Sequence, residues 1–348
     1  MTIACFYCIL YISNENNESL KGFKMAHEVE IVDGEAQMAY AGDTPWHGLG
    51  TPVSNDLTPM QMQQKAGLDW EVQKVPSFIE IDGQKIKTGQ ESLVRLSDNK
   101  VLTNVGEGWN PCQNSDAFNF FAEYVAAGDM EMHTAGSLKG GQITWALAKV
   151  KESFDVFGED TVESFLLFSN PHQYGKSIDV RFTPVRVVCN NTLTMSLEQG
   201  AKNSAKVGHR AVFNAANVKT TLGIASEKFA KYKEMAQFLG SKRVTADDLI
   251  TFYNDVFPNT SRTKEQAQVD KLADLSRNAK LCYDVLETQP GAEFAPGTWW
   301  SALNSVTYVT DHMQGRNAEN RLHSQWFGVN QTRKVKAAEK AVELANAA

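Results

Sequence analysis

The stretch from Phe165 to Leu197 constrains the fold more than any other part of the chain. Its first four residues, Phe165–Phe168, are all apolar, which is typical of a strand buried on both faces. A polar turn follows. Apolar and polar residues then alternate from Ile178 to Phe182, with the period of two that marks a half-buried strand. The stretch therefore predicts two consecutive strands of one sheet.

Pro184 interrupts this alternation. Proline cannot donate a hydrogen bond to a neighbouring strand, so it favours a sheet edge or a bulge. Beyond it the apolar residues change parity, and a one-residue bulge would return both apolar sets to one face. The same bulge would place Arg181 and Arg186 side by side on the other face. With Lys176 and His172 close in sequence, these arginines are a candidate anion site.

Charge is unevenly distributed along the chain. The net charge is -7, which argues against a uniformly basic surface that binds nucleic acid. Between residues 170 and 210, however, the cations are Lys176, Arg181, Arg186, Lys202, Lys206 and Arg210, and the anions are only Asp179 and Glu198. This local excess favours an anionic ligand bound at one place. Ion pairs of the two arginines with Asp179 or Glu198 are the alternative, and we weigh the two interpretations equally.

Residues 1–24 differ from the rest of the chain. The run Ile3–Ile12 is apolar but too short to span a bilayer, and no basic residue precedes it. Met25-Ala26-His27-Glu28 is typical of a start of translation, so we expect residues 1–24 to be a non-native or disordered leader. A signal peptide is the alternative, but no small-residue cleavage motif precedes Lys21.

Residues 25–212 combine strand patterns with short helix patterns, which predicts an α+β core domain. Strands are predicted over Trp70–Ile81, Leu93–Leu96, Val101–Val105, Met130–Leu138, Gln142–Val150, Phe165–Phe168 and Ile178–Cys189, with a hairpin turn at Asp82-Gly83. Helices are predicted over Thr58–Ala66 and Ala117–Ala127. In Gln142–Val150 the bulky residues Ile143, Trp145 and Leu147 alternate with small ones, so a helix or ligand can approach the small face. We expect an antiparallel β-meander with a packed helix, a β-β-β-α-like core.

From residue 213 to residue 348 the pattern is mostly helical. Helices are predicted over Asn214–Leu239, from a capping box at Thr245 to Phe257, and over Thr263–Glu287, Gly297–Met313, Arg316–Phe327 and Thr332–Ala345. These residues are expected to form a helical C-terminal region.

Motifs of catalysis and metal binding are missing from the sequence. Gly140-Gly141 lacks the Lys-Ser/Thr of a phosphate loop, and the seven histidines include no H-x-x-x-H pair. No G-x-S-x-G elbow occurs, and Cys189 lies in an apolar strand that disfavours a reactive thiolate. The odd count of five cysteines indicates reduced thiols of a cytoplasmic protein. We therefore expect no catalytic residues, metal or cofactor.

A case for binding does exist. Lys176, Arg181, Arg186 and Arg210 are candidates to neutralise phosphates, and His172, Tyr174 and Trp145 are candidates to contact bases. Proteins that bind single strands combine a cationic groove with stacking aromatic residues. Aromatic residues on strands belong more often to the core, which is the alternative for Trp145. Trp46 and His47, in a glycine-rich loop, are further stacking candidates, although we favour a core-filling role for them.

Five segments together resemble one known protein family. They are TPWHGLGT (44–51), TAGSLKGG with WALAK (134–149), RFTPVRVVCNNTL (181–193), GTWWSALNSVTYVTDH (297–312) and RLHSQWFG (321–328). On these segments the chain resembles the phage/plasmid-like protein family, which is domain-of-unknown-function family 932. The resemblance covers about residues 25–341. Because the family occurs in phages, plasmids and prophages, it implies a role in the DNA metabolism of mobile elements.

The expected core is also similar in outline to the RecT, Redβ and Erf class of single-strand annealing proteins. No motif of that class aligns here, so no site residue is transferred from it. The resemblances imply a DNA-binding protein of a mobile element that binds or anneals single strands in recombination or replication. We expect it to be a homo-oligomer in the host cytoplasm, without a membrane segment.

Two other functions stay open. One is a host-takeover or antidefence protein that acts through protein contacts, with exposed apolar surface around Trp299, Trp300 and Trp326. The other is an enzyme on a small anionic substrate, with the arginine pair as a clamp and Asp179 or His172 as the acid or base.

Overall fold

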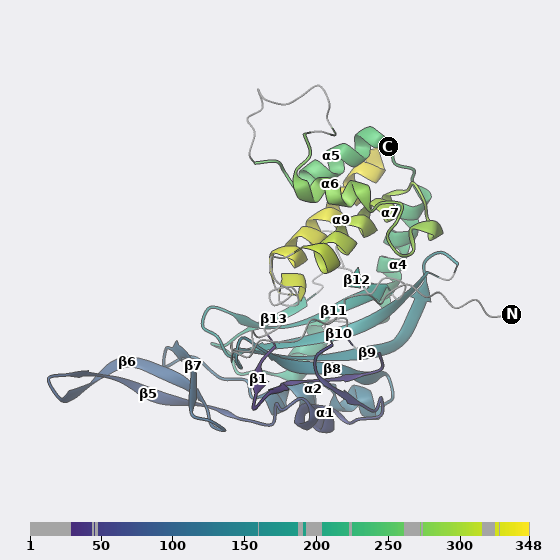
Figure 1. Cartoon of the computed structure of the whole chain (residues 1–348). Coiled ribbons are helices and arrows are strands. Elements are labelled where there is room, and N and C mark those ends of the chain that lie inside the picture. The colour runs from purple at the N-terminus through teal and green to yellow at the C-terminus, as the bar shows by residue number, and fades with distance from the viewer. Residues whose placement is uncertain are drawn as a thin grey trace, which may run out of the picture.

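The structure is a computed structural model that describes residues 29–43, 45, 48–158, 160–186, 191–192, 204–222, 225–260, 272, 274–314, 324–326 and 328–347. The expected leader, Trp46, His47, the side chain of Arg186 and most of Arg316–Phe327 lie outside the described residues. Figure 1 shows a central sheet, two helices beneath it, a group of helices above it and a ribbon-like arm that projects sideways.

The central sheet has eight strands and is mainly antiparallel, and β8 to β11 form the antiparallel meander that the sequence predicts. Its strand order is β12-β11-β10-β9-β8-β3-β4, and β13 also pairs with β11. The bounds are β3 Met38–Ala41, β4 Thr51–Val53, β8 Met130–Leu138, β9 Ile143–Asp155, β10 Thr161–Pro171, β11 Ser177–Arg186, β12 Asn191–Thr192 and β13 Ser204–Gly208. Among the strands that the structure describes, only β3 and β4 pair in parallel. A two-stranded hairpin, β1 (Ile31–Val32) with β2 (Glu35–Ala36), precedes the sheet.

Helices α1 (Pro59–Lys65) and α2 (Asn114–Ala126) pack beneath this sheet (Figure 1). Thr58 and Gln61 form a capping box with proline at the first turn of α1, as predicted. Phe120 and Phe121 of α2 join the core with the small side chains of β9, so the prediction that a helix approaches the small face of this strand is confirmed. α2 begins earlier than expected: Gln113 is its N-cap, and Asn114 is already helical.

Strands β5 (Val72–Ile81), β6 (Gln84–Arg95) and β7 (Lys100–Val105) form a separate three-stranded sheet that we name the arm. The sequence predicts these strands as a first meander that precedes the one beginning at Met130, although it predicts only Leu93–Leu96 where β6 runs from Gln84 to Arg95. The Asp82-Gly83 hairpin is confirmed: Ile81 pairs with Gln84, and both turn residues have the positive φ angles of a tight hairpin. β7 pairs only with the base of β6, so the outer part of the arm has two strands (Figure 1).

The C-terminal region is helical, as expected. Its elements are α3 Ala215–Leu222, α4 Ala225–Ser241, α5 Ala246–Val256, α6 Arg277–Asp284, the 3-10 turn Ala292–Phe294, α7 Trp299–Tyr308, the π-turn Val309–Met313 and α9 Val329–Ala347. Thr245 and Asp248 form the predicted capping box of α5. One buried apolar cluster runs from α1 and α2 through the sheet to α7 and α9. In the described residues, no helix has the length and apolarity needed to cross a membrane.

The bulge predicted at Pro184 is absent. β11 pairs with β10 in one unbroken register from Asp179 to Arg186, with Pro184 opposite Ser164. The register shift lies instead between β9 and β10, at Glu163/Ser164. The physical reason is that both faces of the sheet are buried. Phe182 therefore joins the core on the α2 side and Val185 the smaller core on the other side, so a change of apolar parity needs no bulge.

Candidate functional site

The predicted site residues do not form one cluster. Tyr174, Lys176 and Arg210 are exposed in two turns at the start of β11. The two turns are neighbours because Ser177 of β11 pairs with Gly208 of β13. Lys206 is also exposed, on β13 opposite Asp179. We name Tyr174, Lys176, Lys206 and Arg210 the basic edge.

Each turn of the basic edge is held by the chain around it. The backbone N–H of His172 donates to Gln142 O (2.8 Å), and that of Tyr174 donates to Thr103 Oγ1 in the arm (3.4 Å). In the second turn, Asn110 Nδ2 donates to the Arg210 carbonyl (3.2 Å). The backbones are thus fixed while the side chains face solvent, which is the arrangement expected of a binding surface on a rigid scaffold.

The basic edge has no internal charge compensation. Among the described residues, Lys176, Lys206 and Arg210 form no ion pair. The nearest carboxylate in the sheet register, Asp179, is paired with Arg181. Tyr174, in the same turn as Lys176, is 69% exposed. An exposed aromatic ring on an edge that also carries uncompensated cations suits a ligand with negative charge and flat groups.

His172 lies beneath this edge and is fully buried. Its Nε2 is 3.0 Å from Asn114 Oδ1. Asn114 Nδ2 donates to the carbonyls of Leu68 and Trp70, so Asn114 Oδ1 is the acceptor and His172 carries its proton on Nε2. Burial, followed by the charges of neighbouring His209 and Arg95, lowers the pKa of His172 to about 3. A neutral, buried ring can neither attract a phosphate nor contact a base, so the structure does not support His172 as a contact to bases.

Trp145 is also buried, at 1% exposure. Its ring packs against Trp326 with 5.8 Å between centroids and lies over Gly136, where a Cβ atom would be 2.3 Å from the ring. The core alternative for this residue therefore holds. Its assignment as a base contact does not fit the structure.

Arg181 does not act as an open anion site. It forms an ion pair with Asp179 and donates from Nη1 to the carbonyl of Trp326 (3.3 Å). Its side chain is 17% exposed. Without a bulge, the argument that placed Arg181 and Arg186 on one face is lost. The ion-pair interpretation of Arg181 is confirmed.

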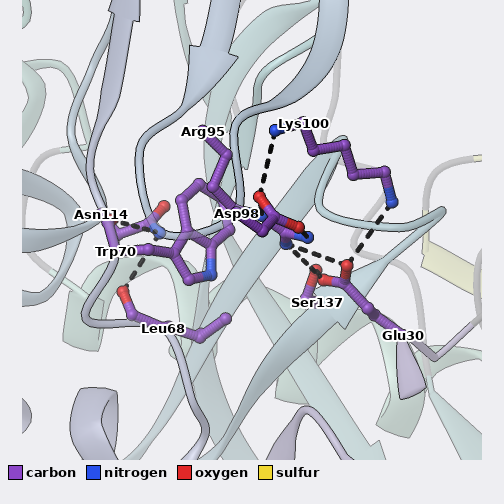
Figure 2. Close-up of polar contacts among 8 residues, drawn as sticks. All are labelled: Glu30, Leu68, Trp70, Arg95, Asp98, Lys100, Asn114 and Ser137. Carbon is purple, nitrogen blue, oxygen red and sulfur yellow. Dashed lines mark hydrogen bonds and ion pairs between the residues drawn. The ribbon is translucent and has the colours of Figure 1, made fainter. Parts of the chain in front are cut away.

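A second polar cluster, which the sequence did not indicate, joins the arm to the main sheet (Figure 2). Arg95 at the end of β6 donates through Nη1 to both oxygens of Glu30 (2.9 and 3.0 Å). Its Nε and Nη2 bind Asp98 (2.9 and 2.7 Å), and its guanidinium lies 5.1 Å from the centre of the Trp70 ring. Ser137 Oγ of β8 donates a further hydrogen bond to Glu30 Oε2, at 2.8 Å.

The charges in this cluster compensate one another. Arg95 is 4% exposed, and the hydrogen bonds that it donates to Asp98 outweigh burial and raise the pKa of Arg95. The same bond lowers the pKa of Asp98. Lys100 lies 3.7 Å from Glu30, so two cations balance two carboxylates. The cluster fastens the arm and leaves no charge for a ligand.

Another compensated pair lies in the C-terminal region. Lys334 Nζ on α9 is 2.8 Å from Asp311 Oδ1, and both side chains are 1% exposed. Burial lowers the pKa of Lys334, against the opposing effect of Asp311. The sequence does not indicate that Lys334 is buried, because the carboxylate that pairs with it lies 23 residues away.

No catalytic constellation emerges from the described residues. There, no group of three or more His, Cys, Asp or Glu could hold a metal ion. Cys112 and Cys282 are buried, and burial raises the pKa of both thiols. Asp179 and His172, the two candidate acid–base groups, are respectively ion-paired with Arg181 and buried as a neutral ring.

Comparison with known proteins places the chain in a family. No curated protein and no solved structure matches it. A family described as "Domain of unknown function (DUF932)" matches residues 101–348, which include the sheet from β8 onwards, the basic edge and the C-terminal helices. The match covers most of the chain, so the protein belongs to the DUF932 family.

Proposed function

We propose that the protein binds single-stranded DNA through the basic edge and serves a phage or plasmid in recombination or replication. The observation that carries this proposal is that one sheet edge exposes the Tyr174 ring together with Lys176, Lys206 and Arg210, which have no ion pair in the described part of the chain. A tyrosine can stack on any base, and three cations can follow a phosphate backbone without reading sequence. The resemblance to a mobile-element family supports DNA as the polymer.

The roles of the site residues change accordingly. Lys176 and Arg210 keep the phosphate-neutralising role and Tyr174 the stacking role, and Lys206 takes the place of Arg181. Each phosphate neutralised on a single strand contributes about -0.7 to the slope of log K against log salt. Three cations therefore predict a slope of about -2 for each protomer.

The test is fluorescence anisotropy of a labelled single-stranded oligonucleotide across a salt series. The variant Lys176→Ala/Lys206→Ala/Arg210→Ala is expected to lose most of the slope and at least about tenfold in affinity at low salt. Tyr174→Ala is expected to weaken binding with little change of slope, because stacking releases no counterions.

The matched control removes three exposed lysines elsewhere: Lys65 on α1, Lys85 at the tip of the arm and Lys231 on α4. It changes the net charge by the same amount. Equal losses in the triple variant and the control would show a diffuse charge effect and contradict the proposed edge. Absence of binding by the unaltered protein at low salt would refute the function itself.

Of the two other functions considered, protein contact through the tryptophans loses its support. Trp299 and Trp300 are 0% and 1% exposed, and Trp326 packs on Trp145. Exposed apolar surface occurs instead on the arm. An arginine clamp with Asp179 or His172 as the acid or base also lacks support, because Asp179 and Arg181 are paired with each other.

A further inference from the structure

The two faces of the arm differ sharply in charge. A residue of β5 and the residue of β6 that is paired with it have their side chains on the same face of the arm. The hydrogen bond between Ser77 Oγ and Ser92 Oγ (2.8 Å) shows that this face continues through the bulge at Pro76/Phe78. One face carries Gln73, Val75, Ser77, Ile79 and Ile81 of β5, Gln84, Ile86, Ser92 and Val94 of β6, and Val101 of β7. None of these residues is charged.

The uncharged face is apolar and open to solvent. Val75, Ile79, Ile81, Ile86 and Val101 are 40%, 49%, 52%, 45% and 56% exposed. A two-stranded ribbon is marginally stable in water by itself, and branched apolar residues gathered on one exposed face mark a protein contact. All charged side chains of the arm strands lie on the other face, so the apolar face offers nothing to a phosphate backbone.

The outer edge of β5 is also unpaired. The backbone N–H of Leu96 donates to the carbonyl of Glu71. The backbone N–H and C=O groups of odd-numbered residues in β5 therefore face β6, and those of even-numbered residues face the open edge. Gln113 covers this edge at Val72, where it exchanges hydrogen bonds of 3.0 and 2.9 Å with the backbone. From Lys74 to Glu80, no described residue bonds to the outward backbone groups. Such an edge is a template for another strand.

We propose that this edge pairs with the same edge of a second copy of the chain, antiparallel and centred on Ser77. The outward residues then meet as hydrogen-bonded pairs, with Lys74 of each copy opposite Glu80 of the other. Val75 of each copy lies opposite Ile79 of the other, so the uncharged face gains two such apolar pairs. Pro76 lies opposite Phe78, where its missing N–H removes one donor but leaves its carbonyl to accept.

Charge complementarity favours a second copy as the occupant. The two-fold axis places Lys74, which binds Glu91 of its own chain at 2.8 Å, opposite Glu80 of the other copy, and it joins the apolar faces into one. The arm from Val72 to Val105 carries five cations and four anions, a net +1, whereas the whole chain carries -7. Contact through the projecting arms therefore brings near-neutral surfaces together and keeps the acidic bodies apart. This inference uses no residue of the basic edge and stands apart from DNA binding.

Cross-linking tests the register. In the proposed dimer Ser77 faces itself in a non-hydrogen-bonded pair, where Cα atoms are about 4.5 Å apart, a distance at which a disulfide forms without strain. Under mild oxidation with copper phenanthroline, the full-length Ser77→Cys protein should give a reducible dimer at least about tenfold faster than Gln84→Cys, which lies far from the axis. The unaltered protein reports the background from native cysteines.

Light scattering tests the contact itself. The unaltered protein should have at least twice the monomer mass of 38.6 kDa. Ile79→Asp should raise the dissociation constant of the dimer by at least about tenfold. Val212→Asp, at an apolar residue 77% exposed outside the arm, should leave it unchanged. A monomer at tens of micromolar, or equal cross-linking at positions 77 and 84, would overturn the proposal.

Discussion

The buried His172 predicts a specific loss of stability in mild acid. In the unfolded chain its pKa has the ordinary value of 6.5, and in the folded protein it is about 3. Nδ1 has no hydrogen-bond partner among the described residues, so a proton added there would be buried without an acceptor. The unfolded state therefore binds the proton more readily, and protonation favours unfolding.

The pH window follows from these two values. Above pH 6.5 the ring is neutral in both states and the stability is fully present; as the pH falls below 6.5, stability is lost progressively until about pH 3. At pH 5 the loss is RT ln[(1 + 10^1.5)/(1 + 10^-2)], which is about 2 kcal/mol. Any folded pKa below about 4 gives nearly the same result, because at pH 5 the unfolded pKa controls the difference.

The assay is urea unfolding of the unaltered protein and of His172→Gln at pH 7.5 and pH 5.0, at constant ionic strength. Glutamine can donate to Asn114 Oδ1 in place of the ring Nε2–H, but it does not titrate. We expect the difference in unfolding free energy between the two pH values to be about 2 kcal/mol smaller in the variant.

His133 and His209 also have pKa values lowered by burial, but both are present in the two proteins and cancel in the comparison. Because the readout is a difference between pH values, a uniform destabilisation by the substitution does not affect it. The same pH dependence in both proteins, with equal m-values, would refute the neutral buried ring.

Two further predictions concern packing. Arg95→Met removes the guanidinium that binds both oxygens of the buried Glu30 and leaves only the half-exposed Lys100, at 3.7 Å. It should lower the unfolding free energy in urea by about 3–5 kcal/mol. Arg95→Met/Glu30→Gln should recover part of the loss, and no recovery would contradict the charge argument. Gly136→Ala places a Cβ 2.3 Å from the Trp145 ring and should cost about 1–3 kcal/mol, while Gly108→Ala, with nothing within 4 Å, should be nearly neutral; equal effects would refute the tight contact.

Local patterns predicted much of the fold. The capping boxes at Thr58 and Thr245, the Asp82-Gly83 turn and the small face of β9 each depend on residues within one element or turn. These features are caused by interactions between residues close in sequence, so they can be predicted from the sequence alone.

The candidate site was predicted less well. Tyr174, Lys176 and Arg210 are exposed as a binding site requires, and their turns adjoin through the β11–β13 pairing. His172 and Trp145 are also residue types that can contact nucleic acid, yet both are buried. Nothing within five residues of His172 indicates that Trp70 and Asn114 will enclose it.

The sequence by itself determined the α+β class, the antiparallel meander, the helical C-terminal region and the excess of positive charge near β11, because these follow from periodicity and composition. Only the tertiary structure decided which cations remain open. Arg181 is bound by Asp179 and by the carbonyl of Trp326, which lies 145 residues further along the chain. Lys176 and Arg210 are exposed to solvent. It also decided that the strands β5 to β7 leave the main sheet and expose an uncharged face. Pairing across long sequence separations sets burial, and burial sets which side chains can meet a ligand.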